Sequence, residues 1–221
     1  MNIDGLKELW KKEVEQATAR KESIIRFLKD NIEPYDDELY GLCYRASAYL
    51  TDGTYLPCVI FRNRESRVNY ANKVIRNRQI NKWFSSKSVK NSNDRIYEGL
   101  VVGDNQISFE DINKVEKCKY AFPCSLLKQI GEIALFFVRG FVAKMKDGKY
   151  VGFRTDARTE FFDMPDEYSG DDIIEIINDC YVYENGQIKI RKQKELDDNE
   201  VFYKDADLYR EKPFFICYFD I

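Results

Sequence analysis

The chain has 221 residues, of which 44% are hydrophobic and 14% aromatic, so it can bury a substantial core and is not disordered as a whole. It contains no histidine, which excludes Ser-His-Asp and Cys-His nucleophile activation and every imidazole-ligated metal site. The net charge is −3, and no apolar run approaches the roughly 20 residues of a membrane helix. No secretory signal pattern is present, so we expect a soluble, cytoplasmic protein.

The cysteines form no Cys-x-x-Cys pair and indicate reduced thiols that serve as small buried hydrophobic residues. No cofactor is expected, because the chain lacks both the Gly-rich phosphate loop and the dinucleotide-binding glycine pattern. The six cysteines are Cys43, Cys58, Cys118, Cys124, Cys180 and Cys217.

Residues 4–30 show helical periodicity, with apolar side chains recurring every three or four residues and basic side chains mostly on other faces. The apolar positions are Leu6, Leu9, Trp10, Val14, Ala17, Ile24 and Leu28. This pattern predicts a long amphipathic helix that ends before Pro34. We favour a helix that covers one face of a sheet; the alternative is a helix that serves oligomerisation or a partner.

Three hairpins are predicted from turn dipeptides between strand-like runs, because glycine supplies the positive φ that a tight turn requires. They lie at residues 40–61, 141–153 and 181–191, around Asp52-Gly53, Asp147-Gly148 and Asn185-Gly186. In the first hairpin, Pro57 indicates an edge strand or a bulge. The Asp-Gly-x-Tyr pattern at both Tyr55 and Tyr150 is too short to argue for a duplication.

Five further segments complete the prediction along the chain. Residues 65–84 read as a second helix, and the polar stretch 85–94 reads as an exposed loop. Residues 124–130 and 169–178 read as short helices, the latter because it opens with a capping-box pattern. Residues 213–221 are apolar at both alternating sets of positions, which predicts a strand covered on both faces.

Charge is distributed unevenly along the chain. Residues 62–95 hold ten basic and two acidic side chains, a balance of +8, whereas residues 160–221 hold seven basic and seventeen acidic side chains, a balance of −10. The basic segment could bind a protein partner or nucleic acid, since cations contact phosphates and aromatic rings stack on bases; it could equally pack on the acidic third. The candidate binding residues are Arg64, Arg67, Lys73, Arg76, Arg78, Lys82 and Trp83.

Two weaker patterns bear on catalysis. An acidic run could hold Mg²⁺ or Ca²⁺ through oxygen ligands, but it lacks the spacing of an EF-hand. Asp147-x-Lys149 matches the acid-x-lysine half of a metal-dependent nuclease signature, although both residues fall in a predicted turn. We therefore expect neither a metal site nor catalytic residues. The acidic run comprises Glu160, Asp163, Asp166, Glu167, Asp171, Asp172 and Glu175.

Together these features predict an α+β protein, in which an antiparallel sheet of several β-hairpins is covered by the long N-terminal helix and the second, basic helix. One compact unit over residues 1–221 is expected, with a possible subdomain boundary in the loop 85–94. For function we favour a non-catalytic intracellular protein that binds a protein partner in an accessory, regulatory or immunity-type role. The alternative is a nucleic-acid-associated protein that uses the basic segment 62–95, and a carboxylate-metal hydrolase or nuclease ranks third.

Overall fold

The computed structural model describes most of the chain and confirms the α+β class. The chain folds into two compact units: unit 1 comprises Met1–Lys117 and Phe214–Ile221, and unit 2 comprises Cys118–Pro213. Unit 2 is therefore an insertion in the sequence of unit 1. The described residues are 3–37, 41–63, 65, 105–130, 139–155, 160–178, 180–182, 187–190 and 208–219.

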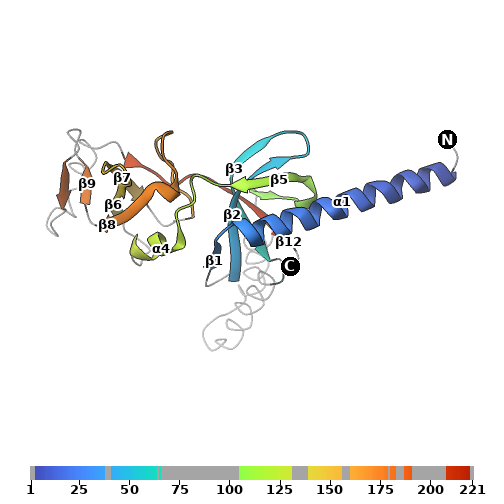
Figure 1. The fold of residues 1–221 in the computed structure, drawn as a ribbon, viewed down its shortest axis with the longest axis horizontal. Coiled ribbons are helices and arrows are strands. Elements are labelled where there is room, and N and C mark those ends of the chain that lie inside the picture. The colour runs from blue at the N-terminus through green and yellow to red at the C-terminus, as the bar shows by residue number, and fades with distance from the viewer. Residues whose placement is uncertain are drawn as a thin grey trace, which may run out of the picture. The chain divides into compact units, whose positions relative to one another are not determined.

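Unit 1 is built on a six-stranded sheet (Figure 1). Its strands are β1 (Pro34–Asp37), β2 (Gly41–Leu50), β3 (Tyr55–Asn63), β4 (Gln106–Ile107), β5 (Ile112–Lys117) and β12 (Phe215–Phe219). The strand order is β1-β2-β3-β12-β4, and β5 also pairs with β2. The β2–β3 hairpin is antiparallel as predicted, but β12 runs parallel to both of its neighbours, β3 and β4.

The first hairpin contains the bulge that Pro57 predicted. The pairing of β2 with β3 shifts register between Ala46 and Ala48, opposite the stretch that holds Pro57. The hydroxyl of Ser47 donates a hydrogen bond of 2.7 Å to the carbonyl oxygen of Pro57. Proline has no backbone N–H, so the register shift at Pro57 leaves no N–H of this residue without a hydrogen bond.

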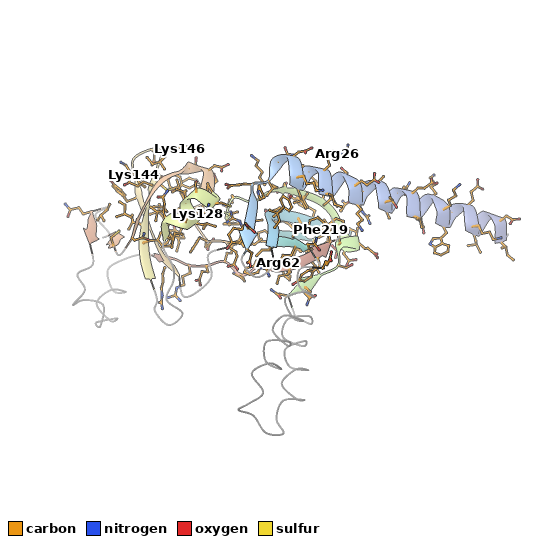
Figure 2. All side chains as sticks on the ribbon, turned by 90° about the horizontal axis from the view of Figure 1, so that it is seen from below. Arg26, Arg62, Lys128, Lys144, Lys146 and Phe219 are labelled. Carbon is orange, nitrogen blue, oxygen red and sulfur yellow. The ribbon has the colours of Figure 1, made fainter. Side chains whose placement is uncertain are left out.

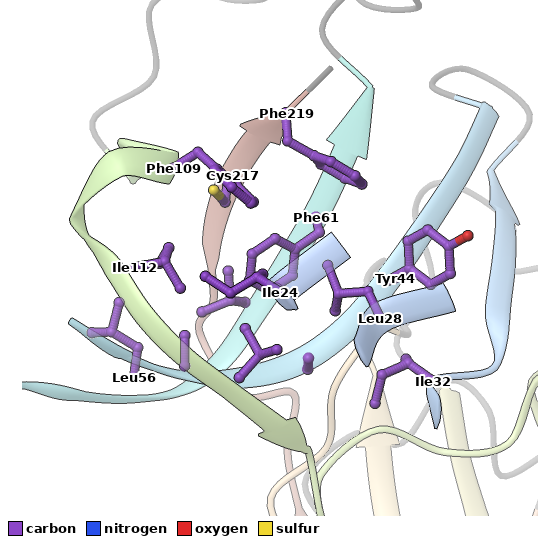
Figure 3. Close-up of a cluster of buried hydrophobic side chains, with 14 residues drawn as sticks. Ile24, Leu28, Ile32, Tyr44, Leu56, Phe61, Phe109, Ile112, Cys217 and Phe219 are labelled. Atoms are coloured by element: carbon purple, nitrogen blue, oxygen red, sulfur yellow. The ribbon is translucent and has the colours of Figure 1, made fainter. Parts of the chain in front are cut away.

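The core of unit 1 lies between the sheet and the C-terminal third of helix α1 (Ile3–Asn31), as Figure 3 shows. Ile24, Leu28 and Ile32 are buried there. They belong to one cluster with the rings of Phe61, Phe109 and Phe219, all of which are at most 9% exposed. Phe109 lies on the short 3-10 helix η2 (Phe109–Asp111), which leads into β5.

Unit 2 contains a four-stranded sheet of order β11-β7-β6-β8 and a separate two-stranded sheet of β9 and β10. The helical elements are α4 (Cys124–Leu127), η3 (Lys128–Ile130) and η4 (Gly170–Asp172), the first two matching the predicted short helix 124–130. The strands are β6 (Arg139–Met145), β7 (Tyr150–Thr155), β8 (Ile173–Asn178), β9 (Cys180–Val182), β10 (Ile188–Ile190) and β11 (Leu208–Tyr209).

Four phenylalanine rings form the centre of the unit 2 core, and each is fully buried. Phe122 lies 4.8 Å from Phe162 and 5.2 Å from Phe153, between ring centroids, and Phe141 stacks on Phe153 at 5.2 Å. Edge-to-face and offset pairs of this kind add to the free energy of area burial, because the positive edge of one ring meets the negative face of another.

The prediction of a helix over 169–178 is wrong after its first turn. The capping box is present, with Ser169 and Asp172 bonded to one another, but it starts only the 3-10 turn η4. The following residues form the strand β8, which pairs with β6. The run Ile-Ile-Glu-Ile-Ile is β-branched, and such residues lose side-chain freedom in a helix but pack well on a sheet.

The hairpins β2–β3 and β6–β7 turn in the same way. In the first, the backbone N–H of Thr54 donates to Oδ1 of Asp52 at 2.9 Å; in the second, that of Lys149 donates to Oδ1 of Asp147 at 3.0 Å. Each aspartate thus closes its own turn locally, as expected for an Asp-Gly hairpin. The third predicted hairpin is present as the antiparallel pair β9–β10.

One further strand pairs with the first strand of each hairpin, β5 with β2 and β8 with β6. In both units the residue before this strand is hydrogen-bonded to the hairpin turn. In unit 1, the N–H of Thr51 donates to the carbonyl oxygen of Asp111 at 2.8 Å, at the end of η2. In unit 2, the N–H of Lys146 donates to the carbonyl oxygen of Asp172 at 2.8 Å, at the end of η4. The Asp-Gly-x-Tyr pattern is therefore part of a larger structural likeness than the sequence alone indicated.

Of the six cysteines, five are buried and Cys124 is half-buried, which confirms their expected use as small hydrophobic residues. The predicted helix 65–84, apart from residue 65, and the loop 85–94 lie outside the described residues. The boundaries between the two units lie at residues 117–118 and 213–214, whereas the predicted subdomain boundary lay in that loop. Among the helices of the described residues, none is long and apolar enough to cross a membrane.

Candidate functional site

The N-terminal half of α1 extends past the sheet that its C-terminal end covers (Figure 1). Every residue from 3 to 19 is exposed. Contacts with η2 come from Arg20, whose guanidinium donates to the carbonyl oxygen of Glu110 at 3.0 Å, and from Lys21, whose ammonium lies 5.8 Å from the ring centroid of Phe109. In Figure 2 the side chains along this half of the helix stand clear of the sheet.

Five large apolar side chains lie on this half of α1, and we call them the exposed stripe. Trp10, which is 70% exposed, occupies its middle. With full surfaces of roughly 150–250 Å² for residues of this size, the stripe presents about 500 Å² of apolar surface, near the upper end of what a monomer usually exposes in one patch. The exposed stripe comprises Ile3, Leu6, Leu9, Trp10 and Val14, which are 68%, 44%, 56%, 70% and 52% exposed.

The exposed stripe lies on the same face of α1 as the residues that pack against the sheet. Leu6 precedes Ile24 by 18 residues, and Trp10 precedes Leu28 by the same 18 residues. At 3.6 residues per turn this separation is about five whole turns, so each pair points in one direction from the helix axis. The helix therefore repeats a core-type face beyond the end of its own core.

The structure does not describe the binding residues that the sequence predicts in the basic segment. Arg64, Arg67, Lys73, Arg76, Arg78, Lys82 and Trp83 all lie outside the described residues. Their role in binding a partner or nucleic acid stays a prediction.

The acidic run is described, and two of its carboxylates contact lysines. Asp163 lies 3.1 Å from the ammonium of Lys212, and Asp166 lies 3.2 Å from that of Lys119. Asp172 accepts from both the hydroxyl and the N–H of Ser169, which lowers the pKa of its carboxyl. Within the described part of the chain, no group of three histidine, cysteine, aspartate or glutamate residues is placed to hold a metal ion.

Asp147 and Lys149 lie together at the tip of the β6–β7 hairpin, with Tyr168 beside them. The phenol of Tyr168 donates to Oδ2 of Asp147 at 2.6 Å, and the ammonium of Lys149 lies 3.6 Å from the same oxygen. The hydrogen bond from Tyr168, with that from the backbone of Lys149, lowers the pKa of the Asp147 carboxyl. These contacts account for Asp147 as the acceptor that closes an exposed turn.

Unit 1 also buries polar side chains on the face of its sheet opposite α1. Arg62, which is 5% exposed, lies 3.7 Å from Asp37, and the guanidinium of Arg45 lies 5.1 Å from the ring centroid of Tyr35. Burial raises the pKa of the neighbouring Cys43 thiol to about 11, so it is neutral at physiological pH. These groups are engaged within unit 1, so among the described residues we take the exposed stripe as the candidate site.

The periodicity of residues 4–30 identified the apolar face, but not which part of it is covered. One further signal was available in the length of the helix. At 1.5 Å per residue its 29 residues span about 44 Å, whereas the longest strand of unit 1, with ten residues, spans about 33 Å, so the helix is longer than the sheet that it covers.

Comparison with known protein families, with curated proteins and with solved structures found no match.

Proposed function

We propose that this protein is a non-catalytic intracellular binding protein that docks onto a protein partner through the exposed stripe of α1. The observation that carries the proposal is a core-type helix face that continues for about five turns beyond its own core. The occupant that fits this face is the apolar side of a partner helix.

The energetics of the helix support this proposal. Most helical stability in proteins comes from packing of an apolar face rather than from intrinsic propensity. Residues 3–19 include a glycine, Gly5, and the β-branched residues Ile3, Val14 and Thr18, which lower helix propensity further. Packing the stripe against a partner supplies the burial that this half of the helix lacks in unit 1.

The chemistry of the stripe supports a protein partner over a charged polymer. Residues 3–19 carry four acidic and three basic side chains, a net charge of −1, so this surface has no strong field. Tryptophan is enriched at the centres of protein interfaces, where its large apolar area is desolvated. Trp10 occupies that position in the stripe.

The test is photo-cross-linking in the native host. p-Benzoylphenylalanine at position 10 lies within the stripe, and at position 12 it lies on the other side of the helix, so the second protein is a matched control. We expect a covalent adduct with a polypeptide from position 10 and not from position 12. The adduct should disappear when Leu6→Gln and Val14→Gln are added, because glutamine keeps helix propensity but removes apolar surface.

Three results would count against the proposal. They are the absence of any adduct from position 10, equal adducts from both positions, and an adduct that survives the glutamine substitutions. Mass spectrometry of the adduct identifies the partner.

A second candidate function rests on the +8 balance of residues 62–95. Nucleic-acid binding through that segment predicts that protein purified at low salt carries nucleic acid and loses it at high salt, because counterions are released on binding. A clean absorbance spectrum together with no mobility shift of DNA or RNA would exclude it.

A further inference from the structure

We infer that the partner of the exposed stripe is a second copy of this chain, and that the two α1 helices pair antiparallel through their N-terminal halves. The inference rests on the proposed function and names the occupant of its docking surface. Leu6 of one copy then lies opposite Val14 of the second copy, and the two Trp10 side chains meet at the two-fold axis.

The area of the stripe supports a second copy. A specific interface usually buries about 1,000 Å² or more in total, counted over both partners, so a partner must present an apolar patch about as large as the stripe. An isologous dimer uses the same patch twice, so two stripes reach about 1,000 Å² of apolar surface without any further contact. The dimer is therefore complete with residues that the structure already presents.

The position of the sheet determines the direction of pairing. Ile24 and Leu28 pack on the sheet of unit 1 from the same helix face that carries Leu6 and Trp10. In a parallel, in-register pair, the sheets of both copies would lie between the two helices beside Ile24 and Leu28, and they would collide there. In an antiparallel pair overlapping at residues 3–17, the sheet of each copy lies beyond the N-terminus of the other helix, so the described strands of unit 1 do not occupy the space between the two helices.

Charge allows this pairing. The net charge of −1 over residues 3–19 means that two copies bring only two net negative charges together. At physiological ionic strength such a repulsion is largely screened beyond about 8 Å. A segment of high charge would instead oppose self-association.

The first test is the molar mass of the purified full chain, measured by sedimentation equilibrium from about 1 to about 300 µM, which spans the affinity of a small interface. We expect a shift from the 26.2 kDa monomer toward twice that mass. The variant Leu6→Gln/Trp10→Gln/Val14→Gln should remain a monomer. The matched control Glu8→Gln/Lys12→Gln/Glu15→Gln changes three residues on the opposite side of the helix and should dimerise as the unaltered chain does.

The second test is the direction of pairing in the purified dimer. p-Benzoylphenylalanine at position 6 should cross-link to the tryptic peptide 13–20 of the second copy, which contains Val14. A cross-link to the peptide 1–7 would show parallel pairing and overturn the antiparallel arrangement. Circular dichroism of every variant identifies any loss of folding. At concentrations where the unaltered chain is a dimer, the spectrum of the control variant should match that of the unaltered chain.

The outcomes separate the two proposals. A monomer at every concentration, or a dimer that the glutamine triple variant leaves intact, overturns the inference. If position 10 still yields a stripe-dependent adduct with a different protein in cells, the proposed function stands while the inference fails. If neither self-association nor any adduct is found, both fail.

Discussion

In unit 1 the strand β5 joins the hairpin β2–β3, and in unit 2 the strand β8 joins the hairpin β6–β7. Both strands follow a 3-10 turn, and both are held to the tip of their hairpin by one backbone hydrogen bond of 2.8 Å. In each sheet a strand lies parallel to the second hairpin strand, β12 beside β3 and β11 beside β7. The same framework is therefore built twice from different side chains.

The two units differ in the helix that covers this framework. In unit 2, Leu126 and Ile130 cover the core from α4 and η3, which together have seven residues. In unit 1, Ile24 and Leu28 occupy the same four-residue spacing, but α1 has 29 residues. About two turns are enough to cover such a core, so the rest of α1 is length that the fold does not require. This contrast supports a docking role for it.

The largest expected effect tests whether the two cores are separate. Phe122→Ala removes a ring that contacts three other buried rings of unit 2, and we expect it to cost about 3–5 kcal/mol. Hydrogen exchange should lose protection in β6, β7 and β8 and keep it in β2, β3 and β5. Phe61→Ala is the matched change in unit 1 and should give the reverse pattern. Equal loss in both units from either change would show that they unfold as one.

A smaller effect tests the turn that precedes the joining strand. A Cβ at Gly170 would lie 2.3 Å from the backbone oxygen of Ala121, so Gly170→Ala should destabilise unit 2 by about 1–3 kcal/mol in chemical denaturation. The corresponding position of unit 1 holds Phe109, a buried core residue. Gly5→Ala is the control: it meets nothing within 4 Å and should slightly stabilise the helix. If Gly170→Ala left the stability unchanged, the backbone around Gly170 and Ala121 would not be tightly packed.

The two hairpin tips should respond alike to loss of glycine. Gly53 and Gly148 have φ of +89° and +88°, and a Cβ at either position meets nothing within 4 Å. Alanine at each position should therefore cost about 1 kcal/mol, entirely from the left-handed backbone. Denaturant titration of the two single variants should give equal losses. Markedly unequal losses would break the likeness between the tips.

The smallest effect concerns a contact present at one tip. Tyr168 and the backbone of Lys149 lower the pKa of Asp147, whereas the pKa of Asp52 is lowered by hydrogen bonds from Thr54. A carboxyl with a lowered folded pKa stabilises the protein above its unfolded pKa, and this contribution is lost as pH falls through the folded pKa. In Tyr168→Phe, NMR titration should show the pKa of Asp147 rising while that of Asp52 is unchanged. An unchanged Asp147 would show that the phenol does not hold it.

The sequence predicted features that depend on near neighbours. The hairpins followed from Asp-Gly and Asn-Gly turns, the bulge from Pro57, and the extent of α1 from its periodicity. The strand β8 was mistaken for a helix because a capping-box pattern is compatible with a 3-10 turn as well as with a helix. Its β-branched residues were the better indication.

Features that depend on distant parts of the chain were not predictable. The parallel pairing of β12 with β3 joins residues more than 150 positions apart, and nothing in either strand specifies its neighbour. The stripe on α1 was identified as apolar, but periodicity assigns a face and says nothing about what covers it. Its exposure follows from where the sheet ends, which is a tertiary property.

The place of β12 in the sheet has a consequence for the order of events during synthesis. β12 lies between β3 and β4, yet it leaves the ribosome after all of unit 2. The last strand of unit 2, β11, is synthesised before β12, which is the last strand of unit 1. Until residues 215–219 arrive, β3 and β4 present unpaired edges, and open edges of this kind promote aggregation. The N-terminal half of the protein is thus the last to mature, and a nascent chain that stalls before Phe214 would leave it unfinished.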